Sequence, residues 1–223
     1  KLTDADRQYS LVHKYTKDDP HLNEMLKKIN FDDLNNFEKK IKKEYDIEVK
    51  LVHFPLHPET PAEGRELQDL FHCGPEEIAE KNNRMRGLLE AEGLMFKDRT
   101  HTYNSRIAQE IGTWAETQDG GDAIHDKFFE AYFVEGRNVG DTSVILDVVT
   151  QTGLHTEEAY SVIKERRFKT AVDGDWSKSQ QYGVTGVPTF IAAGKGLVGA
   201  QPVEALEHLM LEIGAKKRSA DIK

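Results

Sequence analysis

The strand-forming segments of this 223-residue chain lie near its two ends, with a long helical block between them. From residue 62 to about residue 170, apolar side chains recur at helical spacing, and glycines such as Gly93 and Gly153 separate the segments. The helices expected in this block cover 64–72, 75–92, 101–118, 121–135, 141–151 and 156–168. Too few strands stand on either side to form a sheet alone, so we expect them to pair across the block.

On the N-terminal side, residues 21–45 have helical spacing and are followed by the stretch "IEVKLVHFPLHP". Residues 47–53 alternate between the two faces of an extended chain, which indicates a strand. Pro55, Pro58 and Pro61 then favour an extended exit from it. A helix followed by a strand is therefore expected before the helical block.

On the C-terminal side, a helix at about 170–182 precedes two strand segments, "TFIAAG" and "GLVGA". The segment "PVEALEHLMLEIG" closes the chain as a helix with Pro202 in its first turn. Asp141 and Thr156 are the expected N-caps within the helical block. The predicted organisation is 1–61, a helical insertion over 62–168, and 169–223.

The composition excludes several classes of protein. The formal net charge of −9 argues against nucleic-acid binding, and no apolar run approaches the ~20 residues of a membrane span. The N-terminal residues have no signal-peptide core, and the single cysteine, Cys73, allows neither an internal disulfide nor a Cys-rich zinc site. A cytoplasmic location and no metal site are expected. Cys73 is expected to be a small buried residue, with peroxide sensing beside His72 as the alternative.

The stretch "GVTGVPTFI" places Pro188 immediately before a strand, where it removes one hydrogen-bond donor from the ladder. An edge strand or a strand-initiating turn would explain this, as would a cis bond after Val187. Gly183 and Gly186 allow close backbone approach around it. In the cis case, the N–H and C=O of Val187 would point sideways, so that an extended peptide or glutathione could add as a short strand.

The same stretch, followed by "GLVGAQPVEAL", resembles the C-terminal half of DsbA-like thioredoxin-fold proteins, in particular their FrnE-type and polyketide-associated disulfide oxidoreductase branch. "VHFPLHPETPAEG" resembles the second strand of that family, and "FFEAYFVEGRNVGDTSVILDVVTQTGL" resembles its inserted helical domain. The resemblance covers roughly Asp46 to Leu211. It implies an α/β, thioredoxin-like fold with a large helical insertion, in which Val187, Pro188 and Thr189 form a substrate-binding loop.

Redox members of this family carry Cys-x-x-Cys at the start of the first helix, where one thiolate attacks and the second thiol resolves the mixed disulfide. This chain has no such pair, and Cys73 does not match the position. In one register the first strand ends before Arg7, and the two motif positions fall at Arg7 and Ser10. In the other they fall near Lys27 and Asn30, which would require a helically spaced segment to be a strand. We favour the first register; residues upstream of Lys1 would change this assignment.

Three functions are compatible with these observations. The first is a family member without the dithiol that binds a peptide or small thiol compound at Pro188, with Tyr9 and Arg7 nearby. The second is a glutathione-dependent enzyme resembling kappa-class transferases or hydroxychromene-carboxylate isomerases. There the hydroxyl of Ser10 would hold the thiolate of glutathione, and Arg7 would hold a carboxylate. The third is a non-catalytic scaffold, for example a homodimer. The aromatic side chains within residues 128–133 are expected to pack inside the helical block.

Overall fold

The computed structural model of the chain describes residues 8–12, 41–91, 95–199, 201 and 203–218. The chain divides into two compact units: unit 1 comprises Lys1–Phe54 and Asp175–Lys223, and unit 2 is Pro55–Gly174. The sequence placed these divisions after residues 61 and 168. The second division instead falls inside α9 (Lys169–Gln181), a helix that starts in unit 2 and ends in unit 1.

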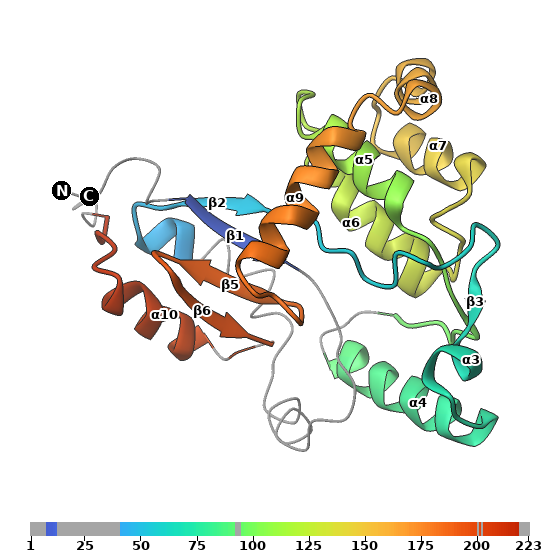
Figure 1. The fold of residues 1–223 in the computed structure, drawn as a ribbon, viewed down its shortest axis with the longest axis horizontal. Helices are drawn as coiled ribbons and strands as arrows, with labels where there is room; N and C mark the ends of the chain where they lie inside the picture. Colours follow the sequence, from blue (N-terminus) through green and yellow to red (C-terminus); the bar gives the residue numbers. More distant parts are fainter. Residues whose placement is uncertain (1–7, 13–40, 92–94, 200, 202, 219–223) are drawn as a thin grey trace. The chain divides into compact units, whose positions relative to one another are not determined.

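Unit 1 contains a four-stranded sheet in the order β2-β1-β5-β6 (Figure 1). β1 (Gln8–Val12) runs parallel to β2 (Glu48–Leu51) and antiparallel to β5 (Thr189–Ala192), which pairs in turn with β6 (Lys195–Val198). The N-terminal strands therefore pair with the C-terminal strands across the insertion, as the sequence predicted. The sheet has one parallel pair and two antiparallel pairs, with β1 in its interior.

The side chains of β5 alternate between two hydrophobic clusters. Phe190 and Ala192 pack with Leu206 and Leu209 of α10 (Val203–Glu212) and with Tyr45. Ile191 belongs instead to a second cluster, whose buried members are Val52, Val184 and Val187. Because neighbouring residues of a strand point to opposite faces, α10 covers one face of the sheet and the segment before β5 packs on the other.

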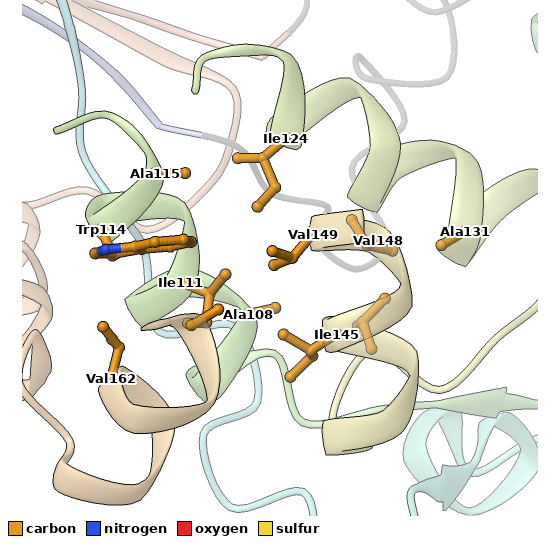
Figure 2. Packing of buried hydrophobic residues seen from close by; sticks show 12 residues of the cluster. Ala108, Ile111, Trp114, Ala115, Ile124, Ala131, Ile145, Val148, Val149 and Val162 are labelled. Carbon is orange, nitrogen blue, oxygen red and sulfur yellow. The ribbon is translucent and has the colours of Figure 1, made fainter. Parts of the chain in front are cut away.

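Unit 2 is mainly helical, as expected. Its helices are α3 (Leu67–Phe71), α4 (Pro75–Ala91), α5 (Arg106–Ala115), α6 (Ala123–Phe129), the π-helix η3 (Glu130–Val134), α7 (Thr142–Gln151) and α8 (Thr156–Glu165). Buried side chains from α5, α6, α7 and α8 meet in one cluster (Figure 2). Trp114 at its edge is 1% exposed and donates its indole N–H to a carboxylate oxygen of Glu158 at 3.3 Å. This cluster gives unit 2 a hydrophobic core of its own.

Three predictions of secondary structure in unit 2 are wrong. The helix expected over 64–72 begins at Leu67, because the two residues before it form a strand, β3 (Arg65–Glu66). The helix expected from residue 101 begins at Arg106, because His101–Thr102 forms β4 and pairs antiparallel with β3. The N-cap of α8 is His155 rather than Thr156, and it makes no side-chain capping bond. The N-cap of α7 is Asp141, as predicted, and its carboxylate accepts the N–H of Ser143 at 2.7 Å. Across the described part of the chain, no helix has the length and apolar character needed to span a membrane.

Candidate functional site

The segment that joins α9 to β5 forms the most distinctive loop of unit 1. α9 ends in a turn in which Gly183 has a φ of 65°, a conformation that favours glycine, and the N–H of Val184 bonds back to Ser179 at 2.9 Å. The peptide bond between Val187 and Pro188 is cis. We call Val184–Thr189 the Pro188 loop; its last residue is the first residue of β5.

Two hydrogen bonds fix the end of the Pro188 loop. The N–H of Gly199, just after β6, donates to the C=O of Pro188 at 2.7 Å. The hydroxyl of Thr189 donates to the C=O of Gly186, inside the same loop. Because both bonds form between groups of the protein itself, they hold the path of the backbone through Pro188 without a ligand.

Val187 combines a buried side chain with an unused main chain. The residue is 4% exposed and packs with Val52 and Val184, whereas Pro188 is partly exposed. Among the residues that the structure describes, neither the N–H nor the C=O of Val187 has a hydrogen-bond partner. Backbone groups in folded proteins are nearly always paired, so an unpaired donor and acceptor on one buried residue distinguish this loop from the rest of the described backbone.

The loop also meets the end of β1. The Cα register pairs Val12 with Thr189 and Leu11 with Phe190. Val12, the last residue of β1, therefore lies beside the residue that follows Pro188. The sequence continues from Val12 as "HKYTKDD", and no cysteine follows before Cys73.

The position of β1 contradicts the register that we favoured from the sequence for the Cys-x-x-Cys motif. The sequence placed Tyr9 and Ser10 at the start of the first helix, but both lie within β1, where Ser10 pairs with Lys50 on one side and Ile191 on the other. The stretch "QYSLV" contains tyrosine, leucine and valine, which suit a strand. Arg7 lies outside the described residues, as do Lys27 and Asn30 of the other register.

A carboxylate of α9, which we did not predict at this site, holds the backbone just after β2. Asp175 accepts the backbone N–H of His53 at 3.1 Å, just beyond β2. His53 lies between Val52 and Phe54, which pack against Val187. Nothing local in the sequence shows that an aspartate on α9 pairs with a residue 122 positions away.

The single cysteine belongs to unit 2. Cys73 is partly exposed in the turn after α3, and its N–H bonds to the C=O of Gln68 at 3.2 Å. The expectation of a buried cysteine is therefore wrong, because the chain turns outward there through His72, whose φ is 51°. Within the described ranges, no group of three or more metal-binding side chains is placed to hold an ion.

Comparison with known proteins places this geometry in a family. Residues 33–211 match the model of the DSBA-like thioredoxin domain. A curated Bacillus subtilis protein, the uncharacterized protein YwbO, is 24% identical over 187 residues, covering 81% of this chain and 89% of its own length.

Solved structures show the same fold. A probable DsbA oxidoreductase from Streptomyces coelicolor is 21% identical and superposes with a TM-score of 0.74, over 97% of this chain and 94% of that one. A 2-hydroxychromene-2-carboxylate isomerase is 16% identical with a TM-score of 0.65, over 93% and 96% of the two chains. The family match spans most of the chain, and the sheet, the Pro188 loop and the helical insertion have the expected order. The protein therefore belongs to the DSBA-like thioredoxin domain family, as a member whose sequence contains one cysteine and no Cys-x-x-Cys pair.

Proposed function

We propose that this protein binds the extended backbone of a peptide, or of a peptide-like thiol compound such as glutathione, at the Pro188 loop, without thiol–disulfide chemistry of its own. The observation that carries the proposal is that the N–H and C=O of Val187, a residue that is 4% exposed, have no hydrogen-bond partner in the described part of the chain. A fixed donor and acceptor on one residue allow a ligand strand to add by two main-chain hydrogen bonds.

The expected affinity is modest. A hydrogen bond between neutral groups contributes about 0.5–1.5 kcal/mol net, so two of them supply a factor of roughly ten to a hundred. Further affinity would come from contacts with the partly exposed Pro188 ring. Recognition through the backbone predicts tolerance of different ligand side chains, since those hydrogen bonds involve none of them.

The non-redox part of the proposal rests on the number of thiols in the sequence. Exchange requires an attacking thiolate and, for turnover, a second thiol that releases the mixed disulfide. The sequence supplies one thiol, Cys73, which belongs to unit 2 and follows α3 rather than β1. The loop is therefore proposed to hold its ligand without oxidising or reducing it.

The position of Ser10 argues against a glutathione-dependent enzyme that uses its hydroxyl. That hypothesis needs the serine at a helix N-terminus, where the helix dipole would favour a bound thiolate. Ser10 lies instead between β2 and β5 in the middle of β1.

The test is a calorimetric titration with glutathione, S-methylglutathione and a capped tripeptide, Ac-Gly-Cys-Gly-NH2. A second tripeptide carries a methyl group on the cysteine backbone nitrogen, which removes one donor. Methylation of that nitrogen should weaken binding about tenfold, whereas methylation of the sulfur should change it little. Equal binding of both tripeptides, or no binding of any ligand at millimolar concentration, would leave only a scaffold role.

Protein variants localise the binding. Pro188→Ala releases the fixed φ of this residue and should weaken the binding of the unmodified tripeptide. Pro75→Ala is the matched control, because Pro75 is exposed and starts α4 in unit 2. Thermal unfolding of both variants checks that they fold. An insulin-reduction assay on the parent protein should give no turnover, and turnover would refute the non-redox part of the proposal.

A further inference from the structure

Arg99 of unit 2 differs from most of the nine arginines that the structure describes. Seven of those nine arginines form an ion pair with a carboxylate: Arg65, Arg86, Arg106, Arg137, Arg166, Arg167 and Arg218. Arg99 is partly buried, and within the described ranges no carboxylate pairs with it. In a chain with 39 acidic residues and a net charge of −9, this lack of a partner is unexpected.

The guanidinium of Arg99 is held on one side only. Its carbon lies 4.8 Å from the ring centre of Tyr132 and 4.9 Å from that of Phe133, and its Nη1 donates to the hydroxyl of Tyr132 at 2.5 Å. Nε is buried and has no hydrogen-bond partner. Nη2 has none among the described residues either. The edge formed by Nε and Nη2 is therefore unused.

That edge has the geometry of a carboxylate site. Nε and Nη2 present two parallel N–H groups, which match the two oxygens of a carboxylate in a bidentate pair. A buried donor without a partner is destabilising, so an anion that satisfies it gains more than it would at an exposed arginine.

The backbone around Arg99 is fixed before any ligand arrives. Asn82, which is 8% exposed, donates its side-chain amide to the C=O of Arg99 at 3.0 Å and accepts its N–H at 3.4 Å. The N–H of Lys97 bonds to the C=O of Phe133 at 2.9 Å, which ties this segment to η3. η3 is a π-helix, an element that occurs frequently at functional sites.

An exposed aromatic ring, that of Phe129, contacts Phe133, one of the two rings against the guanidinium. The ring of Phe129 lies 4.6 Å from that of Phe133 and is 40% exposed. The sequence predicted that the aromatic residues of 128–133 pack inside the unit; Phe128 and Tyr132 do pack against its core, whereas Phe129 is among the exposed hydrophobic residues. A guanidinium against Phe133, which in turn contacts the exposed ring of Phe129, suits a ligand with one anionic end and one apolar body.

We propose that the Nε–Nη2 edge of Arg99, together with Phe129 and Phe133, binds the carboxylate of a small aromatic organic acid. This site belongs to unit 2, and the proposal does not depend on peptide binding at the Pro188 loop. It involves no covalent step: the carboxylate accepts two hydrogen bonds, and the body of the ligand covers the aromatic surface.

The first test uses the unmodified protein and two probes of equal shape, phenylacetate and phenylacetamide. Calorimetry and the NMR signal of the Arg99 side-chain Nε–H report binding. Phenylacetate should bind at millimolar concentration and move the Nε–H signal, whereas phenylacetamide should bind at least about tenfold more weakly, because it lacks the charge. Equal binding of the two probes, or an unmoved Nε–H signal, would overturn the proposal.

Variants then separate geometry from charge. Arg99→Lys keeps the positive charge but loses the two-pronged edge, and should weaken phenylacetate binding about tenfold. Arg137→Lys is the control, because Arg137 already pairs with Asp147 and Glu135, and it should leave binding unchanged. An Arg99→Lys protein that binds as well as the parent would refute the bidentate contact. Tighter binding of inorganic phosphate than of phenylacetate would refute the carboxylate as the ligand class.

Discussion

Val12, the last residue of β1, lies opposite Thr189, the residue that follows Pro188. The end of the first strand and the Pro188 loop therefore adjoin each other in unit 1. In redox relatives, the resemblance implies that a pair of cysteines follows this strand. This chain keeps the loop and the strand but has no cysteine between Val12 and Cys73. These two features are the basis of the proposal that the loop binds a ligand without thiol–disulfide exchange.

The stability of unit 2 should depend strongly on Glu110, a carboxylate that is 2% exposed. Its Oε1 accepts from Arg106 and from Arg166, each at 2.7 Å, which joins α5 to the end of α8. Glu110→Gln removes the charge between two arginines and should lower the free energy of unfolding by about 3 kcal/mol, as for other broken buried pairs. Urea unfolding measures this. Glu90→Gln, at an exposed site on α4, should stay within about 0.5 kcal/mol of the parent.

The effect of that substitution should vanish at low pH. Burial raises the pKa of Glu110, but the hydrogen bonds from Arg166 and Arg106 outweigh it, so the pKa lies below its ordinary value of 4.5. A lowered folded-state pKa gives stability that is complete above the unfolded-state pKa and is lost as the pH falls through the folded-state pKa. The difference in unfolding free energy between the parent and Glu110→Gln should therefore shrink below about pH 4.5. A difference that grows on acidification would contradict this account.

Asp141 should contribute more to the free energy of unfolding than Asp122, which is also an N-cap. Its carboxylate accepts the N–H and the hydroxyl of Ser143 at the start of α7, and these bonds lower its pKa. Asp141→Ala should cost about 1 kcal/mol, measured by thermal unfolding. Asp122 is also an N-cap, at α6, but makes no side-chain capping bond, so Asp122→Ala should cost clearly less. Equal losses would show that the capping bonds contribute nothing.

Alanine substitutions at two glycines of unit 2 should change the free energy of unfolding in opposite directions. A Cβ at Gly121 would lie 1.7 Å from the backbone oxygen of Ala115, so Gly121→Ala should destabilise by about 3 kcal/mol or prevent folding. A Cβ at Gly87, within α4, meets nothing within 4 Å, and Gly87→Ala should stabilise by about 0.5–1 kcal/mol. Urea unfolding of both variants compares the two signs directly, and a stable Gly121→Ala protein would contradict the close contact.

The helices and the C-terminal strands could be predicted from the sequence because their signals are local. Helical spacing and glycine breaks gave α4, α7 and α9 to within about one residue. The stretch after Pro188 gave β5 and β6 for the same reason. The family resemblance added the pairing of distant strands, which no local pattern contains.

β1 could not be placed from the sequence. "QYSLV" is only five residues long, and its role depends on pairing with β2 and with β5, which lies about 180 residues later. Because Tyr9 and Ser10 matched part of a family motif, the predicted register placed them at the start of a helix instead of within a strand. The unpaired edge of Arg99 could not be predicted from the sequence either, because it depends on Tyr132 and Phe133, more than thirty positions away.

The backbone amide of Val187 gives the most direct test of ligand binding at the Pro188 loop. In a 1H–15N NMR titration with Ac-Gly-Cys-Gly-NH2, its proton signal should move downfield and its exchange with water should slow, because a new hydrogen bond forms there. The amide of Gly87 in unit 2 should remain unchanged. An unmoved Val187 signal at saturating peptide, or a response confined to other residues, would contradict the central claim.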